Sequence, residues 1–262
     1  MPLLSATRYL AEVRRVLDRI ERTQLPVIRD LARAIAELVR SGGVVHVFGA
    51  GHSHMLAEEA FARAGGLVPT TAILDPGFMV FGGFRKNSAL ERLEGFGRLV
   101  FENYDTRPGE ILVVNSQSGK NVAPVEVALA AREKGLRVAA ITSLEHTRAV
   151  PPGHPSGKKL YEVADWVIDN CCPLGDAVLD FGPGRPRVAP LSSVASITIW
   201  NMIVAEVAAL LAERAGDPHR TSTGAPEAVT DFPFWVSVNV EGGRAWNERY
   251  FEHYGPRWKN LV

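Results

Sequence analysis

The stretch Gly42–His54 constrains the fold of this 262-residue chain more than any other. Its β-branched and apolar residues stop at Gly49, and a turn containing Gly51 leads into residues 55–64, which have a helical pattern. A strand, a glycine turn and a helix in this order present backbone N–H groups at a helix N-terminus, where an anion such as phosphate is held. The stretch therefore predicts an anion-binding strand–turn–helix unit.

Strands and helices alternate along the rest of the chain. Helical patterns are found over residues 88–104, 122–134 and 191–215. Uninterrupted apolar runs, typical of strands buried on both faces, occupy residues 67–74, 111–115, 136–142 and 165–169. Right-handed crossovers between such strands build a parallel sheet covered by helices on both sides, so the predicted class is α/β.

The two ends of the chain differ from this central region. Residues 5–40 have a helical pattern, and Pro26 is expected to end or kink the first of two helices. Residues 170–190 are predicted to be a loop, residues 232–238 look strand-like, and a last helix runs to about His253. We expect N-terminal helices over residues 1–40, packed on the domain or on a dimer partner. A central domain over 41–215 and a C-terminal extension over 216–262, packed on the same domain, complete the chain.

Composition and charge exclude several classes of partner. The 29 basic and 29 acidic residues give a net charge of zero, which favours neither nucleic acid nor an anionic membrane as a partner. The most apolar helix, 197–211, is interrupted by Asn201 and Glu206, so no membrane span is predicted. The N-terminus lacks the pattern of a secretory signal. The adjacent Cys171 and Cys172 are expected to be thiols of a reducing compartment, with a vicinal redox or metal site as the alternative. The predicted location is cytoplasmic.

The loop 116–121 is the most informative segment after a predicted strand. Ligands of open parallel sheets bind beyond the carboxyl ends of the strands. This loop offers two serine hydroxyls, a glycine and the N–H groups of a following helix, which together suit a phosphate ester; a plain Ser-Gly turn is the alternative. A dinucleotide fingerprint is disfavoured, because His54 stands where its third glycine is required.

Three motifs together resemble the sugar isomerase (SIS) domain: Phe48-Gly-Ala-Gly-His-Ser53, Val114-Asn-Ser-Gln-Ser-Gly119 and the run from Gly135 to Ser143. Within that superfamily the chain most resembles, over nearly its whole length, the uncharacterised bacterial UPF0309 proteins. These share its Gly-His-Ser-His turn, its Ala-Glu-Glu helix, its Gly-Asp-Ala loop and the segment 237–243. Phosphoheptose isomerases and N-acetylmuramic acid 6-phosphate etherases are more distantly similar.

The resemblance implies a three-layer αβα sandwich with a flavodoxin-like five-stranded parallel sheet. It also implies a phosphosugar ligand and a homodimer or higher homo-oligomer that often builds the site from both subunits. No cofactor and no metal are expected, although His54 and Glu58 have a spacing compatible with a metal. The candidate substrate-binding residues are Gly49, Gly51, His52, Ser53, Ser116, Gln117, Ser118, Gly119, Lys120, Asn121, Ser143, Asp176, Ser192 and Ser193.

Aldose–ketose isomerisation needs a base near the sugar C1 and C2 carbons and an acid that opens the ring. Glu58 and Glu59 are adjacent and so point to different faces of their helix, and His54 shares a face with Glu58. The resemblance to phosphoheptose isomerases favours Glu59 as the base, with Glu58 and His54 as further catalytic candidates. A solvated or ion-paired glutamate is the alternative for both carboxylates. The predicted function is a phosphosugar isomerase; the alternatives are a non-catalytic phosphosugar sensor and an etherase-like lyase.

Overall fold

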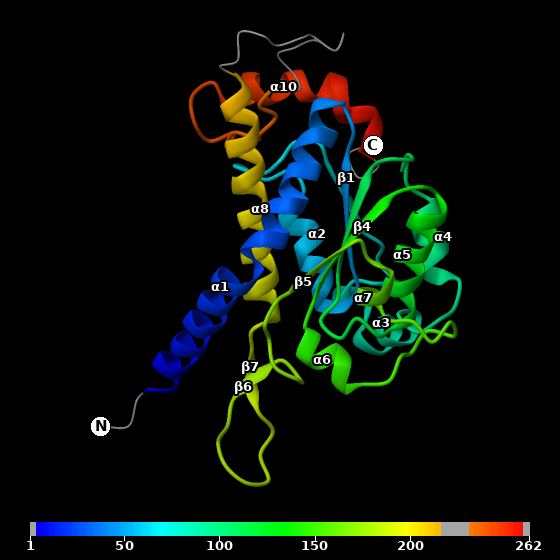
Figure 1. Ribbon diagram of the computed structural model, residues 1–262, viewed down its shortest axis with the longest axis vertical. Coiled ribbons are helices and arrows are strands. Elements are labelled where there is room, and N and C mark those ends of the chain that lie inside the picture. Colours follow the sequence, from blue (N-terminus) through cyan, green and yellow to red (C-terminus); the bar gives the residue numbers. More distant parts are fainter. Residues whose placement is uncertain (1–3, 216–230, 259–262) are drawn as a thin grey trace.

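A five-stranded parallel sheet forms the centre of the computed structural model, which describes residues 4–215 and 231–258 (Figure 1). Its strand order is β2-β1-β3-β4-β5, and Val47 of β1 lies opposite Ala72 of β2 and Val113 of β3. The strands are β1 Val45–Gly49, β2 Thr70–Ile73, β3 Ile111–Asn115, β4 Arg137–Thr142 and β5 Trp166–Asp169. Almost all of their residues are buried, so the predicted α/β class and parallel sheet are confirmed.

Two long helices, α1 (Ser5–Arg40) and α8 (Ser192–Ala215), pack along each other on one face of the sheet, together with the short α2 (Met55–Ala60) (Figure 1). Pro26 lies inside α1, so the expectation that the helix ends there is wrong. Proline removes one backbone N–H from a helix. Here Ile28 and Leu31, just beyond it, are fully buried against the sheet and α8, and this packing holds the helix together.

By length and composition, α8 passes as a membrane-spanning helix over Ser192–Glu213, contrary to the prediction. About 44% of that window is buried inside the protein, however. Ile199, Trp200 and Ile203 are fully or almost fully buried in the core that α8 shares with α1 and the sheet. One side of the helix therefore belongs to the core of the protein, and core helices pass the same test of length and composition.

On the opposite face, α5 (Val122–Glu133) packs against α4 (Phe96–Glu102) and α7 (Leu160–Val163). The continuous helix expected over residues 88–104 is instead two helices, α3 (Phe84–Leu90) and α4. Gly95, at φ +83°, is the N-cap of α4, which explains the break. The helix expected over residues 55–64 also ends early, at Ala60. Three short elements complete this part of the chain: the 3₁₀ turns η1 (Gly51–His54) and η2 (Val80–Gly82), and helix α6 (Leu144–Ala149).

Residues 170–190, expected to be a loop, contain an antiparallel pair of short strands, β6 (Ala177–Leu179) and β7 (Val188–Pro190). This hairpin projects from the end of the molecule at which the central strands finish (Figure 1). The strand-like segment 232–238 forms only a single bridge, between Phe234 and Leu67, within the described residues. The expectation of a strand there is wrong.

The C-terminal segment packs on the amino ends of the strands, through α10 (Gly243–Tyr254) and η3 (Gly255–Arg257) (Figure 1). Its aromatic residues form a cluster over Val44 and Val68, which consists of Trp235, Tyr250, Tyr254 and Trp258. Residues 216–230 of the expected extension lie outside the described residues. The remainder covers the end of the sheet opposite to the strand carboxyl ends.

Candidate functional site

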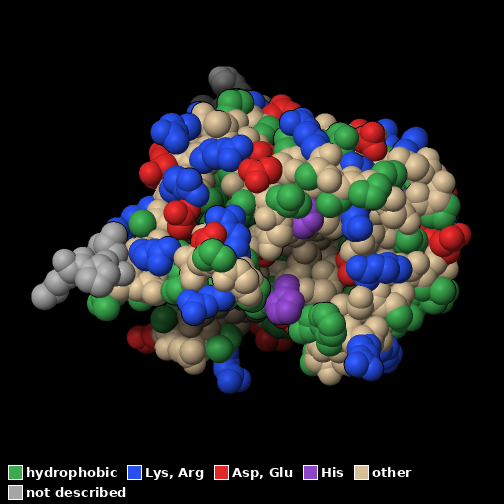
Figure 2. Space-filling model, turned by 90° about the horizontal axis from the view of Figure 1, so that it is seen from below, with side chains coloured by type: hydrophobic (Ala, Val, Ile, Leu, Met, Phe, Trp, Pro, Cys, Tyr) green, Lys and Arg blue, Asp and Glu red, His purple; other side chains and the backbone are tan. Residues whose placement is uncertain are grey.

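The carboxyl ends of β1 and β3 lie side by side, with Gly49 opposite Asn115. The strand order reverses at this point, because the chain continues from β1 to the edge strand β2 and from β3 to β4 on the other side. Such a switch point is where open α/β sheets bind ligands. Figure 2 views this end of the molecule and shows it hollowed, with histidine side chains on two sides of the hollow.

A small, shallow pocket, partly open to solvent, is formed here by three segments. The turn after β1, the end of β3 and the first turns of α8 each contribute polar side chains: His52, Ser53, Asn115, Gln117, Ser192, Ser193 and Ser196. Five of these are candidate substrate-binding residues from the sequence; Asn115 and Ser196 are not. The pocket lining is polar throughout, and only His52 in it can carry a charge.

Two amide groups in this pocket are buried without a complete set of partners. Asn115 is 5% exposed, and its Nδ2 donates to the Ser53 carbonyl (3.1 Å), while its Oδ1 has no partner in the described part of the chain. The Oε1 of Gln117 accepts from Asn170 Nδ2 (2.7 Å), while its Nε2 is buried and equally unpartnered. A buried polar atom left unpaired costs about 1–3 kcal/mol. Such atoms point to a ligand or water that completes the set.

Steric constraints explain why glycine stands at two positions of the first turn. A Cβ at Gly49 would lie 2.2 Å from the Ser53 carbonyl oxygen, and Gly51 has φ +59° while its N–H donates to the Phe78 carbonyl (2.9 Å). His52 is exposed at the pocket. His54 is buried instead: its Nδ1 bonds the Gly51 carbonyl, and its Nε2 lies 3.6 Å from a carboxylate oxygen of Glu58. The turn therefore presents His52 and Ser53 to the pocket and turns His54 inward.

The loop 116–121 closes on itself through Ser116, whose Oγ accepts the N–H of Gly119 (3.2 Å). Gly119 has φ +59°, and a Cβ there would lie 3.0 Å from Thr142 Oγ1. Asn121 donates its amide to Glu91 (2.8 Å). The side chains of Ser118 and Lys120 are half-buried and have no hydrogen-bond or ion-pair partner among residues 4–215 and 231–258. Together with Gln117 of the pocket lining, these two side chains of the predicted phosphate loop have polar atoms without a protein partner among the described residues.

Asp176 occupies the N-terminus of α8. Its Oδ1 accepts the N–H groups of Leu191 (3.0 Å) and Ser192 (2.8 Å), and its Oδ2 accepts the Ser192 hydroxyl (2.6 Å). The residue has φ +67°, a left-handed conformation that Asp and Asn tolerate. The Asp176 carboxylate therefore caps α8. It occupies the two backbone N–H groups that a phosphate at this end of the helix would need.

His146, on α6, is a titratable group near this cluster that was not among the candidate residues. Burial lowers the pKa of His146, and the positive charge of Lys120 lowers it further, while the negative charge of Asp176 raises it. Because the net effect is a lowered pKa, the imidazole is neutral at pH 7. Its Nδ1 is buried and without a partner in the described part of the chain. His146 is not among the residues that line the pocket.

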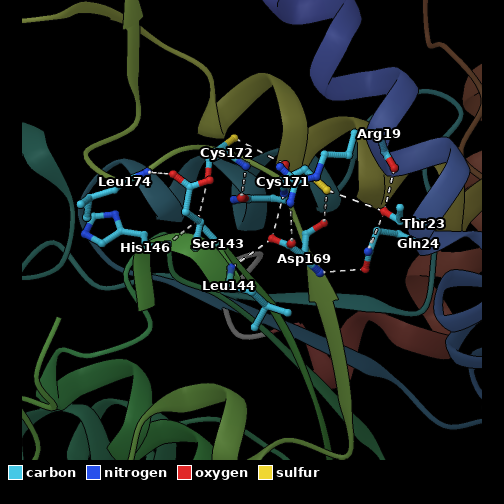
Figure 3. A network of polar contacts seen from close by, with 12 residues as sticks. Arg19, Thr23, Gln24, Ser143, Leu144, His146, Asp169, Cys171, Cys172 and Leu174 are labelled. Carbon is cyan, nitrogen blue, oxygen red and sulfur yellow. Dashed lines mark hydrogen bonds and ion pairs between the residues drawn. The ribbon is translucent and has the colours of Figure 1, made fainter. Parts of the chain in front are cut away.

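Ser143 and the two cysteines belong to a buried network beside the pocket (Figure 3). The Ser143 hydroxyl donates to the Cys172 carbonyl (2.6 Å) and accepts the His146 N–H (3.0 Å), so it caps α6 and does not line the pocket. Burial raises the pKa of both Cys171 and Cys172, which keeps the thiols protonated. No group of three His, Cys, Asp or Glu side chains that would hold a metal is found in the described ranges.

The two candidate glutamates lie outside the pocket lining. Glu59 pairs with Arg63 and accepts a hydrogen bond from Asn201 of α8 (3.2 Å), which is the ion-paired alternative stated for it. Asn201 follows the pocket residue Ser196 by five residues, or about 7.5 Å along the helix axis. Glu58 is exposed beside His54. The structure thus brings five of the substrate-binding candidates together in the pocket lining, whereas both carboxylates lie outside that lining.

The residues that the sequence analysis missed carry recognisable signals. Asn115 is the last residue of a correctly predicted strand, and that position alone places it at the ligand edge. Ser196 shares a helix face with Ser192 and Ser193, since side chains three and four residues apart are neighbours. Asn170 orients Gln117, and nothing in the sequence indicates that contact.

Comparisons with known proteins agree with this geometry. The SIS domain family matches residues 8–143. A UPF0309 protein of Caldanaerobacter subterraneus subsp. tengcongensis is 40% identical over 256 residues, which covers 97% of this chain and 98% of the relative. A UPF0309 protein of Geobacillus kaustophilus is 38% identical over 255 residues, covering 97% and 96%.

Two solved structures share the fold. A phosphoheptose isomerase of Francisella tularensis superimposes with a TM-score of 0.53 at 16% identity, covering 78% of this chain and 96% of that one. A phosphoheptose isomerase of Neisseria gonorrhoeae gives 0.51 at 17% identity, covering 77% and 96%. The fold, the family match and the full-length relatives lead to one assignment: the chain belongs to the SIS domain family, in its UPF0309 group.

Proposed function

We propose that the protein binds a phosphosugar at the carboxyl edge of its sheet and isomerises it between aldose and ketose forms. The observation that carries this is the polar pocket at the β1/β3 switch point, with its two incompletely paired amides, beside a loop whose Ser118 and Lys120 have no protein partner in the described ranges. A Lys ammonium, a hydroxyl and loop N–H groups suit a phosphate. The hydroxyls and amides of the pocket suit a sugar.

Glu59 is the residue we propose as the base that moves the proton between C1 and C2. In the structure, the Glu59 side chain is half-buried and is paired with Arg63 and Asn201. To act, it needs a sugar that reaches along α8 from the pocket. Glu58 and His54, which lie 3.6 Å apart, form the further pair of candidates.

The pairing of Glu59 also supports a second candidate, a phosphosugar sensor that binds without converting. A carboxylate that is held by Arg63 and Asn201 and lies outside the pocket lining is not placed to act on a ligand in the pocket. The two functions share the binding site and differ only in turnover.

A thermal-shift screen against hexose, hexosamine, heptose and muramic acid phosphates tests binding, because a ligand that binds the folded state raises the melting temperature. NMR of each stabilising compound then shows whether it is converted. For the isomerase, Glu59→Gln should bind and lose turnover, while Glu133→Gln on the exposed surface should retain it. If a phosphosugar binds and none is converted, the sensor replaces the isomerase; if no phosphosugar raises the melting temperature, both proposals fail.

We further propose a cytoplasmic homodimer that uses neither nucleic acid nor membrane. The balanced charge supports the absence of polyanionic partners. Two exposed apolar side chains, Leu10 on α1 (45% exposed) and Leu4 just before it (76%), support an assembly through this end of the helix. Light scattering coupled to size-exclusion chromatography should give twice the chain mass, and a monomer at micromolar concentration would contradict it.

A further inference from the structure

We propose that residues 80–86 form a lid that closes over a phosphosugar bound at the carboxyl edge of the sheet. The lid consists of η2, Gly83 and the first residues of α3. The proposal rests on phosphosugar binding, the part of the proposed function that the isomerase and the sensor share. It gives a role to four exposed side chains that are not candidate site residues: Phe81, Phe84, Arg85 and Lys86.

The lid lies between two anchors, one on each of the loops that follow β1 and β3. Before the lid, Phe78 is fully buried, and its carbonyl accepts the N–H of Gly51 in the turn after β1 (2.9 Å). Beyond the lid, the Glu91 carboxylate accepts the amide of Asn121 in the loop after β3 (2.8 Å). These contacts keep residues 80–86 beside the two loops that the proposed ligand contacts.

Two large aromatic side chains of the lid face solvent. Phe81 is 73% exposed and Phe84 is 77% exposed, whereas phenylalanine is usually buried. The pocket is small, shallow and lined by polar side chains only, while ligand pockets are typically lined by apolar and aromatic side chains as well. Figure 2 shows hydrophobic side chains on the rim of the hollow at this end of the molecule. Closure of the lid would therefore remove apolar surface from water and supply the apolar cover that the pocket lacks.

The lid also carries two positive charges. Arg85 and Lys86 are exposed, and neither has a hydrogen-bond or ion-pair partner among residues 4–215 and 231–258. A phosphate ester carries a charge of about −1.5 to −2 at pH 7, yet no Lys or Arg is among the pocket-lining residues. Closure would bring two cations toward the phosphate, with which Arg and Lys form strong charge-assisted hydrogen bonds.

Two glycines separate the phenylalanines and provide a hinge. Gly83 has φ +113°, a backbone conformation that other residues rarely adopt, and Gly82 precedes it. Small residues at such positions absorb the backbone rotations by which loops close over ligands. The hinge therefore allows the lid to move while Phe78 remains packed against Phe48 and Phe96.

Limited proteolysis of the full-length chain measures closure directly, because trypsin cleaves after Arg85 and Lys86 only while these residues are accessible. Cleavage after Arg187, which is exposed in the β6–β7 hairpin, is the control site within the same molecule. Cleavage rates are measured by mass spectrometry with and without saturating fructose 6-phosphate, glucosamine 6-phosphate or sedoheptulose 7-phosphate. The best-bound phosphosugar should slow cleavage in the lid about tenfold or more, because a closed lid must open before trypsin can cut. Cleavage after Arg187 should change by less than about twofold.

Variants of the lid test the two kinds of side chain separately by calorimetry. The double variant Phe81→Ser/Phe84→Ser should weaken the best-bound phosphosugar about tenfold or more, because it removes the apolar area that closure buries. Arg85→Gln/Lys86→Gln should weaken it by a similar factor of about ten. The matched controls are Leu99→Ser on α4, where the side chain is 65% exposed, and Arg22→Gln/Arg33→Gln on the exposed side of α1. The controls should bind within about twofold of the wild type.

Melting temperatures without ligand verify that every variant is folded. The proposal is overturned if a phosphosugar binds the wild type and leaves the cleavage rate of the lid unchanged, or slows cleavage after Arg187 by the same factor. It is equally overturned if both lid variants bind the phosphosugar as tightly as their controls. Failure of the proposed function is a different result, in which none of the three phosphosugars raises the melting temperature of the wild type.

Discussion

The buried carboxylate of Glu110 offers the sharpest test of what holds the C-terminal segment in place. Glu110 is 3% exposed at the amino end of β3, and both of its oxygens accept from Arg257 Nη2 (2.8 and 3.0 Å). It also accepts the backbone N–H of Val44 (3.1 Å) and lies 2.8 Å from His46 Nε2. A single carboxylate thus joins two neighbouring strands to the end of the chain.

Glu110→Gln removes the charge and keeps the shape. Removal of one partner from a buried ion pair destabilises a protein by about 3–5 kcal/mol. We expect the lower end, about 3 kcal/mol, because Asp105 Oδ2 still pairs with Arg257 Nε (2.7 Å) and the glutamine keeps one accepting oxygen. At about 2–4 °C per kcal/mol for a chain of this size, the melting temperature should fall by about 6–12 °C.

The stabilisation that Glu110 provides should depend on pH in a definite direction. Burial by itself would raise the pKa of Glu110, but the hydrogen bond and charge of His46, together with Arg257 and the Arg107 N–H, outweigh it and lower the pKa. A carboxylate with a lowered pKa contributes stability above its unfolded pKa, about 4.3, and loses it as the pH falls through the folded value. The stability gap between wild type and Glu110→Gln should therefore narrow below about pH 4.

Urea unfolding followed by tryptophan fluorescence at pH 7 and at several values down to pH 3.5 measures this gap. The matched control is Glu133→Gln, which breaks the exposed pair with Arg98, where the Glu133 side chain is 61% exposed. It should change stability by less than about 0.5 kcal/mol. The reasoning is refuted if Glu110→Gln costs no more than this control, or if its effect is the same at pH 7 and pH 3.5.

Three further predictions concern the loop, the cysteines and the edge of the sheet. Gly119→Ala should destabilise by about 1–2 kcal/mol in urea unfolding, because the residue has φ +59° and a Cβ would crowd Thr142 Oγ1; wild-type stability would contradict the observed turn. Cys172 should resist a thiol reagent at pH 8 in the native protein and react on unfolding, because burial raises its pKa; rapid native labelling would show an accessible thiolate. Tyr104→Phe should cost about 1–3 kcal/mol, because the hydroxyl donates to the Leu74 carbonyl (2.7 Å) and accepts the Leu74 N–H (2.9 Å) at the end of β2; a neutral effect in thermal unfolding would contradict this role.

The sheet could be predicted from the sequence because its determinants are local. Buried parallel strands are uninterrupted apolar runs, and all five expected strands are present in the order that a flavodoxin-like sheet requires. Pro26 does not end its helix, and the segment 88–104 is not one helix, for two different reasons. Burial of Ile28 and Leu31 outweighs the missing N–H of proline, and the positive φ of Gly95 breaks a helix whose apolar spacing looks continuous.

The candidate site was predictable to the extent that it is made of loops at strand ends. His52, Ser53 and Gln117 follow such ends and line the pocket. Partners far apart in sequence were not predictable: Asp176 caps a helix that begins 16 residues later. Arg63 and Asn201 both hold Glu59, and the Asn201 contact spans 142 residues. The partners of the Glu59 carboxylate therefore depend partly on α8, which the sequence around Glu59 does not reveal.

The aromatic cluster at the amino ends of the strands has a consequence for how the protein is made. Val44 and Val68 remain uncovered until Trp235, Tyr254 and Trp258 are synthesised. At about 5–20 residues per second, the ribosome needs about 10–40 s to go from Val44 to Trp258. During that interval the nascent chain presents an apolar sheet end with the Glu110 carboxylate still unpaired with Arg257. The amino end of the sheet is therefore completed last, and a chain released early by truncation would expose this surface to aggregation.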